Sequence, residues 1–108
     1  MTKVVFHLHD VDKWPSLVAN LKNLNKAQPE IEINVVVNGP AVSGFFAAEK
    51  LKKFTLLTAK GIYFFACEQA LKGQGLLVEN LPLEIKHVTY GVEKLVSLQS
   101  LGAAYIKV

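Results

Sequence analysis

The sequence contains no arginine, because all twelve of its basic residues are lysines. Arginine supplies most of the bidentate contacts by which proteins recognise bases and phosphates, so its absence argues against sequence-specific nucleic-acid binding. The lysines are also scattered along the chain, and the only cluster is Lys50, Lys52 and Lys53, which we interpret as a solvated helix face. We therefore expect no nucleic-acid partner, although the formal net charge is +3 at pH 7.

Cysteine and long apolar runs are equally scarce. Cys67 is the single cysteine, so no disulfide can form within the chain, which is typical of a reducing compartment. No apolar run approaches the ~18 residues that a membrane-spanning helix needs. The apolar residues near the N-terminus lead directly into charged and polar ones, which is unlike a signal peptide. These absences favour a cytoplasmic protein with no membrane partner.

Apolar residues are abundant, at 51% of the 108 residues with a mean hydropathy of +0.28. This length suits a single domain covering residues 1–108, with enough side chains to bury a full core. The apolar share exceeds the ordinary one and includes Phe45 and Phe46, in a segment that is otherwise half exposed. We therefore predict an apolar subunit contact and a homo-oligomer.

Apolar strands alternate with amphipathic segments along the whole chain. The patterns predict strands over residues 3–9, 31–37, 62–66, 84–88 and 103–107. They predict helices beginning near Trp14, Ala41, Glu68 and Gly91, the second of which runs to Lys60 and is split near residues 44–48. Strict alternation implies a mainly parallel sheet with helices on both faces. The predicted fold is therefore a three-layer α/β/α domain with a five-stranded sheet.

Two of the helices should bury stripes that the spacing of their apolar residues defines. In the last helix the buried residues should be Val92, Leu95, Val96 and Leu98. In the helix that begins near Trp14 they should be Leu17, Val18, Leu21 and Leu24.

Cys67 is the main candidate for chemistry, because it lies where the third strand gives way to a helix. Sites in parallel α/β sheets lie outside the carboxyl ends of the strands. Main-chain N–H groups and the dipole of a helix N-terminus stabilise a thiolate, whereas Glu68 is a neighbouring negative charge that opposes one. The alternative is that Cys67 is a small buried hydrophobe, as most free cysteines are. Its accessibility distinguishes the two interpretations.

His7 and His9 are two residues apart on the first strand, so they share a face and can reach the crevice of Cys67. A cysteine beside imidazoles suggests thiolate activation or a metal site. Two histidines without a third ligand at known spacing are more typical of hydrogen-bonded polar groups, so we predict no metal site. The pattern does not assign a face to His87.

Two glycine-containing segments follow strands or helices, at Asn38-Gly39-Pro40 and Gly73-Gln74-Gly75. Neither has the glycine spacing of a P-loop or dinucleotide-binding site, so both are interpreted as turns. No Ser/His/Asp triad or pair of catalytic carboxylates is recognisable. The pocket around Cys67 is therefore predicted to be lined by residues near the strand ends: His7, His9, Asn38, Gly39, Glu68 and Gln69.

Several segments, taken in order and spacing, resemble the DsrE/DsrF-like family in its short single-domain branch. They are KVVFH (residues 3–7), VVVNG (35–39), FFAC (64–67), ALKG (70–73) and VTYGV (88–92), followed by Leu95, Gln99, Gly102, Tyr105 and Ile106. The resemblance covers nearly the whole chain. It implies a flavodoxin-like α/β/α fold, cytoplasmic oligomers that are often built on trimers, and no organic cofactor.

The same resemblance implies a function. In the sulfur-trafficking members of the family, a cysteine at the end of the third strand carries sulfane sulfur as a persulfide, and Cys67 falls at that position. Those members work beside dedicated subunits, so a sulfur donor or acceptor protein is an expected partner. The alternative is a non-catalytic oligomeric module that binds a small molecule or a protein at the same edge.

Overall fold

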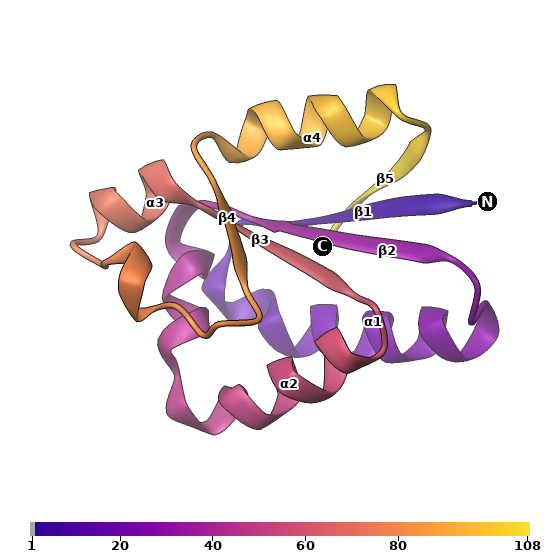
Figure 1. Cartoon of the computed structure of the whole chain (residues 1–108), viewed down its shortest axis with the longest axis horizontal. Helices are drawn as coiled ribbons and strands as arrows, with labels where there is room; N and C mark the ends of the chain where they lie inside the picture. The colour runs from indigo at the N-terminus through magenta and orange to yellow at the C-terminus, as the bar shows by residue number, and fades with distance from the viewer. Residues whose placement is uncertain (1) are drawn as a thin grey trace.

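A computed structural model describes residues 2–108, and its five strands form one sheet (Figure 1). The strands are β1 (Lys3–Leu8), β2 (Glu32–Val37), β3 (Tyr63–Cys67), β4 (Lys86–Val88) and β5 (Ala103–Lys107). The α-helices are α1 (Trp14–Ala27), α2 (Leu51–Ala59), α3 (Glu68–Gly73) and α4 (Gly91–Ser100). Short 3₁₀ helices are η1 (Val11–Lys13), η2 (Gly39–Phe46), η3 (Ala48–Lys50) and η4 (Val78–Asn80).

All strands are parallel, in the order β4-β3-β2-β1-β5. Three successive crossovers step in one direction from β1 to β4, and the last one returns across the sheet to β5. Because crossovers are right-handed, the first three place α1, α2 and α3 on one face and the last places α4 on the other (Figure 1). This confirms the predicted three-layer, flavodoxin-like α/β fold.

The two layers of the core are unequal. Nineteen buried residues lie between the sheet and the helices α1, α2 and α3, including Trp14, Phe54 and Phe64 with their rings edge to face. Beneath α4 the buried set is small: Val5, Val36, Phe65, Leu95, Leu98 and Ala103. One ten-residue helix does not cover five strands, so Tyr63 of β3 and Tyr105 of β5 stay exposed.

The stripe predicted for the last helix is wrong in part. Leu95 and Leu98 are buried against the sheet, but Val92 and Val96 are 64% and 65% exposed. Gly91, Leu95 and Leu98 are spaced by four and three residues and form the inner face, so Val92 and Val96 turn outward. In α1 the predicted stripe holds for Leu17 and Leu21, which are buried, whereas Val18 and Leu24 are half-buried.

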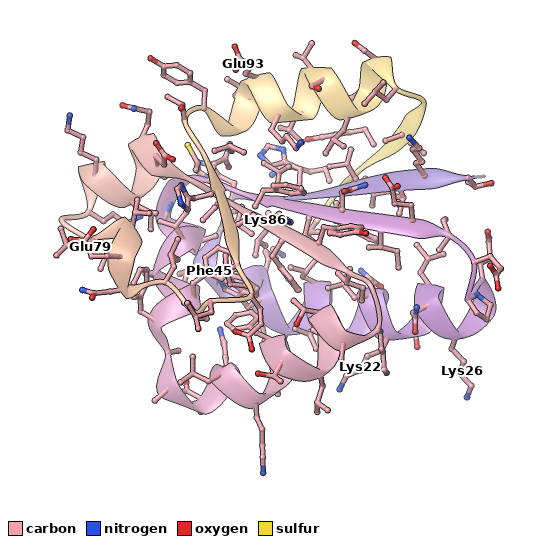
Figure 2. The ribbon with its side chains drawn as sticks, in the orientation of Figure 1. Lys22, Lys26, Phe45, Glu79, Lys86 and Glu93 are labelled. Carbon is pink, nitrogen blue, oxygen red and sulfur yellow. The ribbon has the colours of Figure 1, made fainter. Side chains whose placement is uncertain are left out.

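The long helical region predicted from Ala41 is mostly 3₁₀ helix, and the α-helix begins only at Leu51. Phe45 is fully buried and Phe46 is half-buried, so this pair does not supply the apolar surface that we predicted (Figure 2). Gly44 lets this segment pack closely against Trp14, because a Cβ on Gly44 would overlap the indole. The indole N–H donates to the carbonyl of Ala41 at 2.8 Å. No helix among residues 2–108 has the length and apolar character to cross a membrane.

Candidate functional site

The sheet edge between β3 and β4 is where two neighbouring connections leave toward opposite faces. After β3 the chain enters α3, whose Leu71 packs in the larger core, whereas after β4 it enters α4 on the other face. Diverging connections open a crevice outside the carboxyl ends of the strands. Cys67 and Val88 are register partners at that edge, so Cys67 lies where the two connections diverge.

Cys67 is the last residue of β3 and is 7% exposed. The backbone N–H of Gly91, the first residue of α4, donates to its Sγ at 3.3 Å. Cys67 also precedes α3, but its side chain makes no capping hydrogen bond there. The N–H group that we expected at the sulfur therefore comes from α4 and not from α3. Burial opposes a thiolate, and the N–H donor favours one.

Gly91 packs directly against the cysteine. A Cβ placed on Gly91 would lie 3.2 Å from the Cβ of Cys67, 3.4 Å from the Cβ of Asn38 and 3.5 Å from Val36 Cγ1. Glycine thus lets α4 approach closely enough for its N–H to meet the sulfur. Sequence reasoning interpreted Gly91 only as part of a turn, and a glycine at the first position of a helix was the one available signal.

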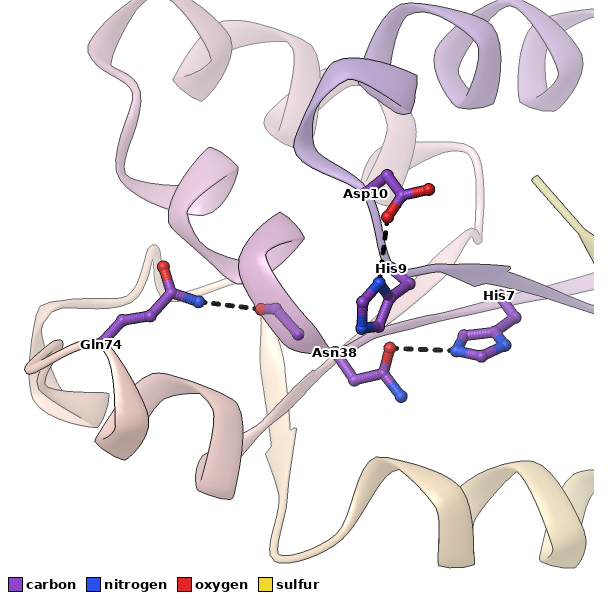
Figure 3. A network of polar contacts seen from close by, with 6 residues as sticks. His7, His9, Asp10, Asn38 and Gln74 are labelled. Carbon is purple, nitrogen blue, oxygen red and sulfur yellow. Dashed lines mark hydrogen bonds and ion pairs between the residues drawn. The ribbon is translucent and has the colours of Figure 1, made fainter.

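On the other side of Gly91, Asn38 belongs to a hydrogen-bonded chain of three side chains. His7 Nε2 lies 3.0 Å from Asn38 Oδ1 (Figure 3). His7 Nδ1 lies 2.6 Å from the hydroxyl of Tyr105. Burial lowers the pKa of His7, and Lys107 and His9 lower it further, against the hydrogen bond to Asn38. A neutral imidazole donates from one nitrogen and accepts at the other. It therefore donates from Nε2 to Asn38 and accepts the Tyr105 O–H at Nδ1.

His9 serves the neighbouring loop. Its Nδ1 lies 3.0 Å from Asp10 Oδ1, and this hydrogen bond lowers the pKa of Asp10 (Figure 3). Its ring rests on Gly39, where φ is +55° and a Cβ would overlap the ring. Gln74, just beyond α3, donates to the carbonyl of Gly39 at 2.9 Å. His7 and His9 therefore lie at one edge with Asn38, but only His7 bonds to it.

Glu68 is directed away from the sulfur. His87 is the register partner of Ala66, so its side chain lies on the face opposite to those of Cys67 and Val88. Its Nδ1 lies 2.5 Å from Glu68 Oε2, which draws that carboxylate toward His87. Gln69 is exposed on α3. Within residues 2–108, no three His, Cys, Asp or Glu side chains are grouped closely enough to hold a metal ion.

The arrangement around Cys67 combines a buried thiol at this edge of the sheet, a main-chain donor on its sulfur and the polar side chain of Asn38 beside Gly91. Tyr105 is the other participant that sequence reasoning missed, because it is 98 residues from His7 and only the pairing of β5 with β1 brings them together. Such a group of residues can hold an anionic sulfur species.

Comparison with known proteins finds solved structures that are similar to this chain in fold. No protein-family model and no curated protein matches the chain. The solved structure of MTH1491 from Methanobacterium thermoautotrophicum, a protein of unknown function, is 29% identical with a TM-score of 0.92, covering 100% of both chains. The ychN protein from E. coli is 18% identical with a TM-score of 0.77, also covering both chains completely. BT1422 from Bacteroides thetaiotaomicron, of unknown function, is 18% identical with a TM-score of 0.77, covering 98% of this chain and 94% of its own.

Proposed function

We propose that this protein is a sulfur carrier in which Cys67 accepts sulfane sulfur and passes it on as a persulfide. The observation that carries this proposal is the N–H of Gly91 on Cys67 Sγ, at the edge where the connections after β3 and β4 diverge. A main-chain donor aimed at a thiol stabilises its anionic form, which is the nucleophile in sulfur exchange. We also propose membership of the DsrE/DsrF-like family, supported by the segments quoted above and the full-length likeness in fold.

The proposed chemistry needs no external oxidant or reductant. The Cys67 thiolate attacks the outer sulfur of a donor persulfide R–S–SH. A new S–S bond forms at Cys67, the S–S bond of the donor breaks, and the electron pair of that bond leaves on the thiolate R–S⁻. The transferred sulfur keeps its proton and its oxidation state. An acceptor thiolate then attacks the outer sulfur of the Cys67 persulfide in the same way. Because Cys67 is the only cysteine, both exchanges are intermolecular.

The donor must reach the sulfur of a residue that is only 7% exposed, so exchange requires local opening at the N-terminus of α4. The connection before α4 is suited to this, because Thr89 and Tyr90 are exposed and β4 is an edge strand of three residues. Segments with few buried contacts open locally at a low cost in free energy. We place this carrier in the cytoplasm, where a lone thiol stays reduced.

The test is intact-mass spectrometry of the protein after incubation with a persulfide donor. We expect a gain of about 32 Da, one sulfur atom, that dithiothreitol removes and that Cys67→Ser abolishes. A parallel measurement of alkylation by iodoacetamide across pH 5–9 reports the thiolate fraction of Cys67. Absence of the adduct, with alkylation no faster at neutral pH than that of a free cysteine, would refute the carrier function.

The second candidate is a non-catalytic binding module, and the burial of Cys67 is the observation that favours it. It predicts that Cys67 stays unreactive while the protein still self-associates. For either function we propose a homo-oligomer, because the α4 region exposes four large apolar or aromatic side chains, Tyr90, Val92, Val96 and Leu101.

A further inference from the structure

We propose that the donor or acceptor bound at Cys67 is a thiol carrier that bears carboxylates, recognised by Lys86 and Lys94; this rests on the proposed function. We call these two residues the lysine pair. The proposal concerns the region beside Cys67 that is formed by β4 and α4. The sulfur exchange described above does not itself involve the residues of this region.

The lysine pair lies on the same face of the sheet as Phe65, two residues before Cys67. Lys94 lies one helical turn after Gly91, and its Nζ lies 4.4 Å from the centroid of the Phe65 ring. Phe65 is two residues before Cys67 on β3, so both side chains lie on the α4 face of the sheet. Lys86 on β4 is the register partner of Phe65 and lies on that face too (Figure 2). Lys94 thus places one ammonium group over the ring of Phe65, and Lys86 adds a second positively charged residue on the same face of the sheet.

A hollow of about 140 Å³ lies between the end of β4 and the helix α4. It is lined by Val88, Tyr90, Glu93, Lys94 and Ser97, and Val88 is the register partner of Cys67. Its volume equals that of roughly four or five water molecules. A carboxylate with a short carbon chain fits in this space, whereas a folded segment does not. The hydroxyl groups of Tyr90 and Ser97 can complete the hydrogen bonds of such a carboxylate.

The charges of the lysine pair are available to a ligand. Neither lysine forms an ion pair with a carboxylate of residues 2–108. The Phe65 ring holds the Lys94 ammonium by a cation–π contact, which positions the charge without neutralising it. Glu68 is drawn to His87 on the opposite face, which leaves Glu93 as the acidic residue lining the hollow. The hollow thus favours an anion on its Lys94 side.

The experiment compares two donors, N-acetylcysteine persulfide and its methyl ester, which differ by one negative charge and one methyl group. The readout is the rate at which Cys67 gains the adduct of about 32 Da. At 10 mM salt we expect the acid to react roughly two- to fivefold faster than the ester, which is the range for an exposed ion pair. In 1 M salt the ratio should fall to one, because the screening length shrinks from about 30 Å to about 3 Å.

Three variants assign the effect to these side chains. In the double variant Lys86→Gln/Lys94→Gln, the rate with the acid should equal the rate with the ester at low salt. The rate with the ester should be unchanged. Glu93→Gln should raise the ratio. Lys22→Gln on α1, on the far side of the molecule, is the matched control and should leave it unchanged (Figure 2).

A second pair of donors, persulfides of the peptides acetyl-Glu-Glu-Cys-Glu-Glu-amide and acetyl-Gln-Gln-Cys-Gln-Gln-amide, distinguishes the source of the carboxylates. If only the acidic peptide reacts faster than its neutral counterpart, the carboxylates belong to a protein donor. If the acid also reacts faster than its methyl ester, small thiols are donors as well. Equal rates within both pairs, with Cys67 still taking up sulfur, would overturn the proposal. No uptake from any donor would refute the carrier function itself.

Discussion

Gly91→Ala tests the contact on which the candidate site depends. The backbone of Gly91 is not in the left-handed region, so alanine adopts it without strain and the added methyl group is the only perturbation. That methyl would lie 3.2 Å and 3.4 Å from the Cβ atoms of Cys67 and Asn38. Both atoms are bonded to the main chain and do not rotate away, so α4 must shift outward.

The magnitude follows from two opposed contributions. Overpacking a close contact costs about 1–3 kcal/mol, and replacing glycine by alanine in a helix regains at most about 1 kcal/mol. We therefore expect Gly91→Ala to lower the free energy of unfolding by about 1–2 kcal/mol. The shift also lengthens the N–H···S hydrogen bond and uncovers the buried thiol, so the rate of Cys67 alkylation at pH 7 should differ from that of the wild type.

The assays are urea unfolding followed by circular dichroism, and the rate of iodoacetamide alkylation. Gly73→Ala is the matched control, because Gly73 ends α3, has no left-handed backbone and meets no atom within 4 Å of an added Cβ. It should be neutral or slightly stabilising. If Gly91→Ala matched this control in both stability and alkylation rate, the packing argument for the site would be wrong.

Three further outcomes are expected. Because burial lowers the pKa of His7 below 6.5, the unfolded chain binds more protons in the window just below that value. Stability should therefore fall as pH drops from 6.5 to the folded pKa, and His7→Gln should remove this slope in pH-dependent urea unfolding. Tyr105→Phe removes the donor to His7 Nδ1, so the pKa of His7 should rise in an NMR titration; an unchanged value would contradict the assigned tautomer. Val96→Glu should reduce the mass measured by light scattering, whereas Leu56→Glu, at a similarly exposed position on α2, should not. A wild-type monomer at micromolar concentration would refute the oligomer.

Much of the fold was predictable because its signals are local. The predicted strands lie within two residues of the observed ones at either end, since short apolar runs bounded by turn residues leave few alternatives. The errors lie where packing decides. Val92 and Val96 fit a helical apolar pattern as well as Leu95 does, and only the orientation of α4 on the sheet separates buried from exposed positions.

The candidate site likewise combines features that are local in the sequence with features that depend on packing. Cys67 was recognisable because its position at the end of a strand is a local property. His7 and Asn38 were placed at the same edge by the rule for parallel strands, and their hydrogen bond agrees with that rule. Glu68 was expected to oppose a thiolate, but its pairing with His87 depends on the face that His87 presents, which the pattern left open.

The sequence by itself determined that this chain forms alternating strands and helices, a parallel sheet and a cysteine at a strand end, because each of these follows from residues close together in the chain. Only the tertiary structure decided the strand order β4-β3-β2-β1-β5, and with it the return of α4 over the otherwise open face. That return brings the N–H of Gly91 to a sulfur 24 residues away and the hydroxyl of Tyr105 to His7. Local patterns act over a few residues, whereas these contacts depend on how all four crossovers pack together.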